Sequence, residues 1–179
     1  MNETNTATTP APATPKSYAP HLTLYHPTGT GGGAALQLGL RFNRPGEDRY
    51  DCFFLDLAAQ KSAPTREGDK RVPATFDWEN KMTVKLDFAD ICELLLVLEG
   101  RAEKAGGQRN GLYHDSGKCS TVITFQKSAD KAGYFLGLSR KAKEGGQVAR
   151  VQIVLSETEA IGLRCLFQTG LFFMTFRIS

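Results

Sequence analysis

Apolar and polar residues alternate along several short stretches of the chain, and this period of two is the pattern of half-buried β-strands. In residues 34–42, leucine or phenylalanine occupies every second position from Leu36 to Phe42, with glutamine, glycine and arginine between them. The same alternation appears in residues 82–87 and 151–156. The pattern therefore predicts strands that turn one face to a core and keep the other face polar.

The strand patterns are arranged as two copies of one unit. The tripeptide Leu-Tyr-His occurs at residues 24–26 and again at 112–114, and in both places a glycine follows three residues later. Three apolar runs and one longer, helix-like apolar segment come next in each copy. We therefore predict an α+β fold of two β-β-β-β-α repeats in one domain. The predicted boundaries are 21–179 for the domain, about 22–100 and 111–176 for the repeats, and about 101–110 for a charged, glycine-rich linker.

Each predicted helix carries start and stop signals. An acidic residue three positions after an aspartate or serine has the spacing of an N-cap and the N3 position of a capping box. The two pairs with this spacing are Asp87 with Asp90 and Ser156 with Glu159. We expect Gly100 and Gly170 to end the two helices, because glycine is the residue most favoured just after a helix.

The first helix, after Asp87, has almost no polar face. A helix that is apolar nearly all round has to be buried on more than one side, and a small two-layer domain covers only one. We therefore predict that other copies of the chain cover this helix in a homotetramer. The predicted interface residues are Ile91, Leu94, Leu95 and Leu98.

Composition narrows the function classes only moderately. A net charge of +3 in 179 residues permits a polyanionic partner without arguing strongly for one. The four cysteines have no metal-ligand spacing, and no apolar run approaches the roughly 20 residues that cross a bilayer. Residues 1–20 are rich in alanine, threonine and proline, which predicts a disordered tail. We expect a cytoplasmic protein (nucleoid-associated in a bacterium) with no metal, no cofactor and no membrane partner; the sequence leaves an organelle open.

A glycine-rich segment at residues 29–34 comes close to the dinucleotide-binding pattern G-x-G-x-x-A. A dinucleotide site needs a helix N-terminus aimed at the phosphates, whereas this segment precedes a predicted strand. An enzyme is also disfavoured, since His26 and His114 occupy equivalent repeat positions and no Ser-His-Asp order or metal spacing is present. We expect neither a nucleotide site nor catalysis.

The polar faces of the predicted strands carry glutamine, arginine, lysine and threonine but almost no carboxylate. Such a face suits a phosphate backbone and unpaired bases, although an ordinary solvated face would show the same pattern. The polar candidates for a nucleic-acid site are Gln37, Arg41, Lys81, Lys85, Gln126 and Arg150. The candidate rings for base stacking are Tyr50, Phe54, Phe76, Trp78 and Tyr134, with Phe135 as a further ring. Core burial is the commoner role for any single ring, and Trp78 shares the parity of Met82 and Val84.

Three short segments occur in order along the chain. They are Gly-Gly-Gly-Ala-Ala-Leu at residues 31–36, Phe-Asp-Trp-Glu-Asn-Lys at 76–81 and Tyr-His-Asp at 113–115. Together with the order of strands and helices from about residue 22 to 176, they resemble the Whirly family of single-stranded DNA-binding proteins. The corresponding family motifs are Lys-Gly-Lys-Ala-Ala-Leu, Tyr-Asp-Trp-Gly-Arg-Lys and Phe-His-Asp. Fold relatives of this family include the guide-RNA-binding proteins of kinetoplastids.

The resemblance implies two antiparallel four-stranded sheets packed crosswise, with the helices holding a homotetramer. Single-stranded DNA would run over the sheets and between neighbouring protomers with little sequence preference, and no cofactor or catalysis is implied. Gly31 and Gly33 replace the two lysines of the family motif, so this loop lacks those phosphate contacts. Lys81 matches the family, and Arg41 and Lys85 could compensate. RNA is an alternative ligand, because nothing in the sequence reads the 2′-hydroxyl. A pure assembly protein is the other alternative, in view of the weak net charge.

Overall fold

The structure of the chain, a computed structural model, describes residues 20–42, 51–129 and 132–176. Residues 1–19 of the predicted tail and the candidate ring of Tyr50 lie outside the described residues. The described parts form antiparallel sheets and two α-helices, so the predicted α+β class is confirmed.

The first repeat builds one sheet. Its main strands pair in the order β1 (Leu22–His26), β2 (Ala34–Arg41), β3 (Cys52–Ser62) and β7 (Met82–Leu86). A two-residue strand, β6 (Thr75–Phe76), also pairs with β3, so this sheet has five strands where we expected four. Strands β4 (Thr65–Glu67) and β5 (Lys70–Val72) form a separate hairpin. The sequence pattern missed these three strands because residues 65–76 carry no alternation of apolar and polar positions.

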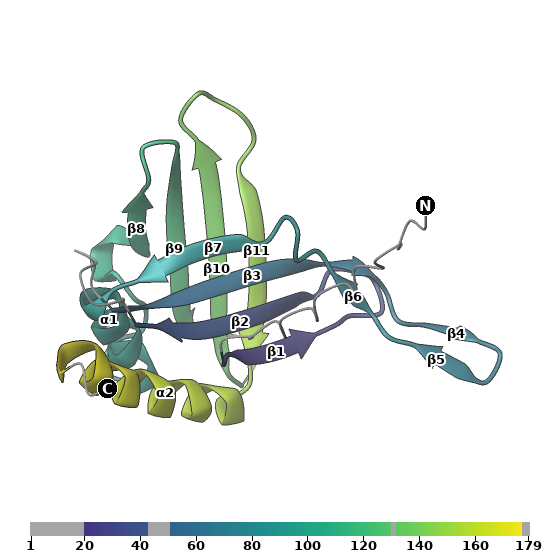
Figure 1. Cartoon of the computed structure of the whole chain (residues 1–179), viewed down its shortest axis with the longest axis horizontal. Coiled ribbons are helices and arrows are strands. Elements are labelled where there is room, and N and C mark those ends of the chain that lie inside the picture. Colours follow the sequence, from purple (N-terminus) through teal and green to yellow (C-terminus); the bar gives the residue numbers. More distant parts are fainter. Residues whose placement is uncertain (1–19, 43–50, 130–131, 177–179) are drawn as a thin grey trace, which may run out of the picture.

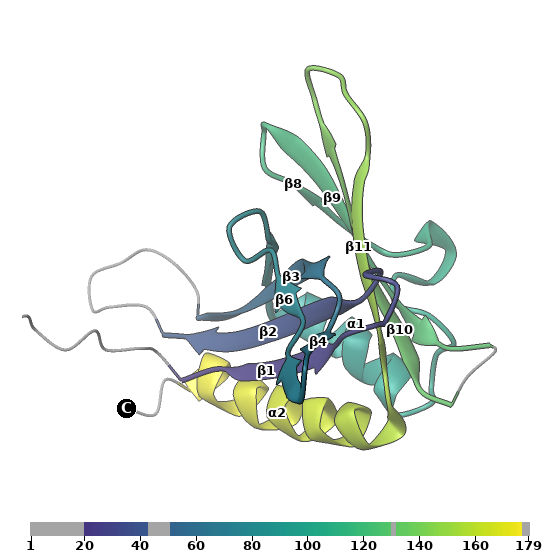
Figure 2. The same cartoon turned by 90° about the vertical axis from the view of Figure 1, so that its right-hand side faces the viewer.

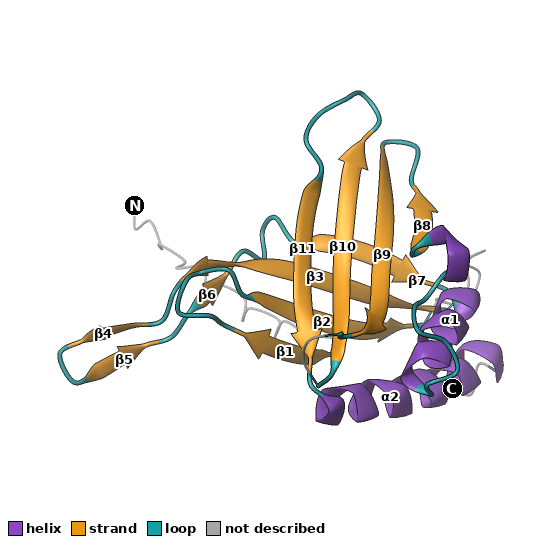
Figure 3. Cartoon of the chain, turned by 180° about the vertical axis from the view of Figure 1, so that it is seen from behind, coloured by secondary structure: helices purple, strands orange, loops and turns teal. Residues whose placement is uncertain are grey.

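The second repeat builds the other sheet. Its strands pair in the order β11 (Ala149–Leu155), β10 (Tyr134–Ala142), β9 (Cys119–Lys127) and β8 (Leu112–Asp115). The strands of the two sheets cross each other, and the helices lie together at one side of the crossing (Figures 1 and 3). Helix α2 (Glu157–Phe176) runs beside β1, and α1 (Phe88–Leu98) packs against α2 (Figure 2). A 3-10 helix (Gly107–Arg109) lies in the linker between the repeats.

Strand alternation turns one face of each sheet towards a shared core, as the sequence pattern predicts. Leu36 of β2 and Leu57 of β3 are fully buried, as are Ile123 and Leu138 in the second sheet. Arg140 also reaches from the inner face of the second sheet to the first, where its guanidinium donates to the backbone oxygen of Thr83 at 2.6 Å. Apolar packing and this hydrogen bond therefore hold the two sheets together.

Helix α1 is covered by its own chain, which corrects the expected interface. It packs against α2, β7 and β9. The four predicted interface residues are all buried within the protomer: Ile91, Leu94, Leu95 and Leu98. The expectation that α1 needs other copies to cover it is wrong, because both sheets and the second helix pack around it within one chain. The largest group of exposed apolar side chains on one element lies instead on α2: Ile161, Leu166, Phe172 and Phe176.

The predicted helix starts are confirmed, and one of the two predicted stops is wrong. Asp87 and Asp90 form a complete capping box, and Ser156 and Glu159 exchange the same pair of hydrogen bonds. Gly100 follows α1 with a φ of 70°, the left-handed conformation of a C-terminal cap. Gly170, however, lies inside α2, which continues to Phe176.

The physical reason for Gly170 is close packing against a ring. A Cβ at this position would lie 2.2 and 2.4 Å from two ring carbons of Phe53. Phe53 is itself buried and packs edge-on against Phe167 of α2, with 5.5 Å between the ring centroids. Glycine at position 170 therefore lets the helix approach the first sheet.

Each histidine of the repeated tripeptide forms a side-chain contact with the other repeat. His26 Nε2 lies 2.8 Å from Oε1 of Glu159, the N3 acid of α2, and His114 Nε2 lies 3.1 Å from Oδ1 of Asp90, the N3 acid of α1. The hydrogen bond with Asp90 raises the pKa of His114 despite burial. Burial alone would raise the pKa of Glu159, but hydrogen bonds with His26 and Ser156 lower it overall. Each histidine thus binds the capping acid of the helix in the other repeat, which is a structural role.

Candidate nucleic-acid interface

Each sheet has a second face turned away from the core, which we call its outer face. Cross-strand partners share a face, so the pairing registers place most of the predicted site residues on these outer faces. On the first sheet, one row of cross-strand partners consists of Gln37, Asp56 and Thr83. The next row on the same face consists of Gly39, Phe54 and Lys85. The predicted polar and aromatic candidates are therefore brought together in groups, with the exceptions described below.

Three rings gather at one end of the outer face of the first sheet. The ring centroid of Tyr25 lies 5.4 Å from that of Phe76 and 6.4 Å from that of Trp78, which stands edge-on to it. Tyr25 is 57% exposed, and the other two rings are half-buried. We call Tyr25, Phe76 and Trp78 the aromatic patch. Exposed ring surface of this kind is where an unpaired base can stack.

Trp78 reaches the aromatic patch because it lies in a turn. Its backbone N–H donates to the carbonyl oxygen of Phe76 at 3.0 Å, and the Asp77 carboxylate accepts from the side-chain amide of Asn80 at 2.9 Å. The hydrogen bond with Asn80 lowers the pKa of Asp77. The parity shared with Met82 would place Trp78 in the core, but parity holds only within a strand, and Trp78 precedes β7.

A second group lies at the opposite end of the same outer face. The guanidinium carbon of Arg41 lies 6.0 Å from the ring centroid of Phe54, and Lys85 is the cross-strand partner of Phe54. Gln37, Arg41 and Phe54 line one shallow hollow. Arg41 and Lys85 are exposed, and neither forms an ion pair with any described residue. We call Arg41, Phe54 and Lys85 the Phe54 patch.

Lys81 is occupied by a carboxylate of its own chain. Its Nζ donates to Oδ2 of Asp56 at 2.6 Å, and the Thr83 hydroxyl donates to Oδ1 of the same carboxylate at 2.5 Å. The Asp56 side chain is only 11% exposed, so without these donors it would be a buried, unsatisfied charge. Asp56 is thus a carboxylate on a face that the sequence pattern predicts to be almost free of carboxylates. Lys81 neutralises it and is therefore a poorer phosphate ligand than Arg41 or Lys85.

Of the neighbouring rings Tyr134 and Phe135 on the second sheet, Phe135 faces outward, and the prediction of Tyr134 as an exposed ring is wrong. Tyr134 is buried and stacks in the core on Phe125, with 5.6 Å between centroids and 11° between ring planes. Strand alternation turns the neighbouring Phe135 to the outer face. A Cβ at Gly137 would lie 3.1 Å from the Phe135 ring, so this ring covers the glycine beside it.

The polar candidates of the second sheet flank Phe135 on the same outer face. Gln126 is the cross-strand partner of Phe135 on β9, and Arg150 faces Ser139 on the neighbouring strand of that surface. Gln152, the cross-strand partner of Gly137, lies between Phe135 and Arg150 on this face. Arg150 is exposed and has no ion pair within the described parts of the chain. Amides, a free cation and a ring thus share this face as well.

The Leu-Tyr-His tripeptide puts an exposed tyrosine on the outer face of each sheet. Tyr25 is 57% exposed and Tyr113 is 61% exposed, and the Tyr113 hydroxyl donates to Oγ of Ser120 at 2.8 Å. Neither tyrosine was among the predicted site residues. The signal that could have found them is the duplication, because alternation turns the tyrosine away from the face shared by leucine and histidine.

The glycine-rich loop folds around the side chain of Gln60. The Gln60 Oε1 atom accepts the backbone N–H groups of Thr28 and Gly33, both at 2.8 Å, and the Gly32 N–H donates to the Thr28 hydroxyl at 2.9 Å. These donors are used within the loop and do not form a phosphate cradle. A Cβ at Gly33 would lie 2.2 Å from the carbonyl oxygen of His26, so no lysine fits at this position.

A hollow beside this loop joins the outer faces of the two sheets. It is lined by Tyr25 and the glycine-rich loop on one side and by Gln152 and Val154 of β11 on the other. Since Gln152 and Val154 share the outer face of the second sheet with Phe135, the hollow links the aromatic patch to that face.

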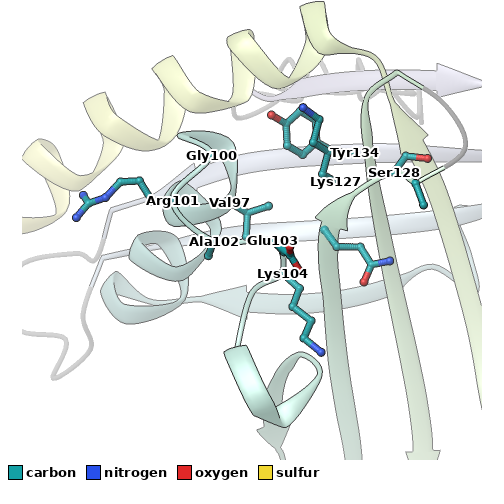
Figure 4. A pocket seen from close by; sticks show the side chains of 11 residues that line it. Val97, Gly100, Arg101, Ala102, Glu103, Lys104, Lys127, Ser128 and Tyr134 are labelled. Carbon is teal, nitrogen blue, oxygen red and sulfur yellow. The ribbon is translucent and has the colours of Figure 1, made fainter.

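Another cavity, of about 610 Å³, lies where the linker meets β9, and Arg101, Lys104 and Lys127 line it. In Figure 4 the Arg101 side chain extends away from the other labelled residues. Arg101 lies 3.8 Å from the Glu99 carboxylate, and Lys104 donates to the side chain of Asn110. Two of its three cations already have partners, so this cavity is a weaker anion site than the outer faces.

Metal sites and membrane-spanning helices are both absent from the described ranges. No three His, Cys, Asp or Glu side chains there come together as metal ligands would. No helix in those ranges has both the length and the apolar character needed to span a bilayer.

Comparison with known proteins identifies the fold. No protein-family model matches the chain, and no curated protein matches it in sequence. Among solved structures, WHY1 from Arabidopsis thaliana has a TM-score of 0.67 at 21% identity, over 90% of this chain and 88% of that one. The plant transcriptional regulator PBF-2 has a TM-score of 0.64 at 18% identity, over 90% and 85%. A guide-RNA-binding protein complex bound to a guide RNA has a TM-score of 0.56 at 19% identity, over 89% and 94%.

These similarities confirm the predicted Whirly-like fold. The two crosswise antiparallel sheets and two helices of this chain correspond to WHY1 over most of both chains. Identities near 20% show a shared fold and leave the activity of this chain to its own residues.

Proposed function

We propose that this chain binds single-stranded nucleic acid across the outer faces of its sheets, as a binding protein without catalytic activity. Single-stranded DNA held with little sequence preference is the ligand that we favour, in a role in DNA maintenance or transcription. The observation that supports the proposal most strongly is that exposed or half-buried rings share these faces with cations that form no ion pair with any described residue. Tyr25 and Phe54 lie on one face with Arg41, and Phe135 lies on the other with Arg150.

The chemistry of these groups suits a single strand better than a duplex. Stacking of one base on an aromatic ring contributes about 1–3 kcal/mol, and it is available only to bases that are not already paired. A cation on a phosphate adds attraction that weakens with salt. Ring stacking and phosphate contacts use parts that all nucleotides share, which supports low sequence preference.

RNA is the second candidate, and a specific observation favours it. One of the solved structures with this fold is described as a guide-RNA-binding protein complex bound to a guide RNA. Another is described as a plant transcriptional regulator, which favours DNA. Rings and phosphate-binding cations serve both nucleic acids, so the choice rests on binding measurements.

We also propose that the chain forms a homotetramer, through α2 rather than through the predicted residues of α1. Ile161, Phe172 and Phe176 of α2 are each at least half exposed. Together with Cys165 they recur at spacings of four, seven and four residues, which places them along one side of the helix. A large exposed apolar stripe of this kind is typical of a protein–protein contact.

A charge in the middle of this stripe tests the assembly. Phe172→Glu is expected to lower the molar mass measured by light scattering, because burying a carboxylate in an apolar contact is unfavourable. Gln147→Glu, on the exposed loop between β10 and β11, is the control and is expected to leave the mass unchanged. A native chain that already has the monomer mass of 19.6 kDa would refute the proposed assembly.

Two substitutions on the outer face of the first sheet test the proposed function. Tyr25→Ala is expected to weaken binding of single-stranded DNA by about 1–3 kcal/mol at every salt concentration, because base stacking releases no counterion. Arg41→Gln is expected to weaken binding mainly at low salt and to reduce the slope of log K against log salt by about 0.7. Fluorescence anisotropy across a salt series measures both effects.

A matched control comes from elsewhere on the surface. Arg101 is an exposed arginine in the linker and lies off the outer faces. Arg101→Gln should therefore bind as the native chain does. The proposed interface is wrong if this control loses as much affinity as Arg41→Gln.

A further inference from the structure

The hairpin of β4 and β5 has no role in the core and projects from the first sheet. Figure 1 shows it extending beyond both sheets, on the side away from the helices. All six strand residues are exposed except Val72, which is half-buried. An isolated two-stranded hairpin is at best marginally stable, so this hairpin adds little to the stability of the fold. Folding alone therefore does not account for its exposed, charged side chains.

The register of the hairpin places two arginines directly opposite each other. Arg66 pairs with Arg71, and cross-strand partners point to the same face. Like charges at such positions destabilise a strand pair. Neither arginine forms an ion pair with any residue that the structure describes. The other face carries Glu67 opposite Lys70, a pair of opposite charges. One face is therefore purely cationic and the other is balanced.

A phosphate group would relieve the repulsion within the arginine pair. Each guanidinium presents a planar fork of N–H donors that fits two phosphate oxygens, and the anion lies best between two such forks. A carboxylate of the same chain could serve, but Glu67 lies on the opposite face. The pair therefore has the chemistry of a phosphate site that is filled from outside the chain.

The hairpin is continuous with the aromatic patch. Strand β5 leads through two residues into β6, which contains Phe76, so Arg71 is five residues from a ring of the patch. Five extended residues span at most about 18 Å. A nucleic-acid strand that stacks a base on the aromatic patch and continues along β5 would bring its next phosphates to Arg66 and Arg71.

We propose that Arg66 and Arg71 form a phosphate-binding arm that extends the single-strand path beyond the aromatic patch. The inference rests on the proposed function, and it adds a contact to the phosphodiester backbone outside the two sheets. Because phosphodiesters are common to DNA and RNA, the arm binds either backbone. Its contribution appears only when the strand is long enough to pass from the sheet onto the hairpin.

The double variant Arg66→Gln/Arg71→Gln tests the arm, with single-stranded DNA and RNA of about 8 and about 24 nucleotides. For the longer strand, the slope of log K against log salt is expected to fall by about 1.4, which is about 0.7 for each phosphate that an arginine no longer neutralises. The shorter strand is expected to bind the double variant and the native chain equally. Lys70→Gln, which removes a cation from the other face of the same hairpin, is the matched control and should leave both slopes unchanged.

The outcomes separate this inference from the function on which it rests. If the native chain binds neither strand length, the proposed function fails and the arm fails with it. If the native chain binds both lengths and the double variant keeps the native slope on the longer strand, only the arm is refuted. An equal fall in the salt slope for Lys70→Gln would also refute the arm, because the effect would then come from the total positive charge of the hairpin and not from its arginine face. The melting temperature of each variant should stay at the native value, since the hairpin packs against no core residue.

Discussion

Gly170→Ala is expected to lower the free energy of unfolding by about 1–3 kcal/mol, although alanine is a better helix former than glycine. The new Cβ would lie 2.2 Å from a carbon of the Phe53 ring, well inside van der Waals contact. That ring cannot move freely, because it is 4% exposed and packs edge-on against Phe167. Either the ring or the helix has to shift, and both belong to the core. Chemical denaturation of the native and variant chains measures the change.

Gly162 provides the matched control in the same helix. A Cβ at this position would meet no atom within 4 Å, and the residue is exposed. Gly162→Ala is therefore expected to raise stability by up to about 1 kcal/mol, the usual gain in helix propensity. Adding Phe53→Leu to Gly170→Ala should recover part of the loss, since the shorter side chain frees space. Equal stabilisation by both alanines would mean that α2 does not approach the first sheet at Gly170.

Lys81→Ala is expected to reduce stability by about 1–3 kcal/mol, which is the cost of leaving a buried charged group without its partner. Asp56 would keep only the Thr83 hydroxyl, on a side chain that is 11% exposed. The loss should appear in the free energy of unfolding before it appears in DNA affinity. Thermal and chemical denaturation at neutral pH measure it directly.

Neutralising the carboxylate is the corresponding rescue. Asp56→Asn in the Lys81→Ala background removes the unpaired charge and keeps an oxygen that can accept from Thr83. We expect the double variant to regain most of the lost stability, so the two substitutions should be strongly coupled in a double-mutant cycle. A coupling close to zero would show that Lys81 and Asp56 do not depend on each other.

The sequence predicted the fold where a local pattern has one physical cause. Alternation identified the main strands, and the capping boxes at Asp87 and Ser156 marked both helix starts. It failed where the cause lies in a distant part of the chain. Glycine is common just after a helix, so the sequence predicts that the helix ends at Gly170. Only the close approach of this position to the Phe53 ring shows that the glycine is needed for packing. The burial of α1 likewise depends on α2 and the second sheet, which no local count of apolar residues includes.

The candidate site was predicted less completely for the same reason. Parity separates Tyr134 from Phe135, but it does not tell which of two neighbouring rings faces the core. Lys81 was selected by its motif, and its pairing with Asp56 follows only from the register of β3 and β7. Tyr25 forms the aromatic patch with Phe76 and Trp78, which are distant from it in the sequence.

Competition between nucleic acids tests the central claim most directly. A labelled single strand of DNA is bound to the native chain, and unlabelled single-stranded DNA, single-stranded RNA or duplex DNA of the same sequence is added at equal nucleotide concentration. Binding through rings that stack on unpaired bases predicts that the single strand displaces the label and the duplex does not, and the RNA competitor decides between the two candidate ligands. Displacement by the duplex as strong as that by the single strand, or no binding of the labelled strand at low salt, would contradict the account.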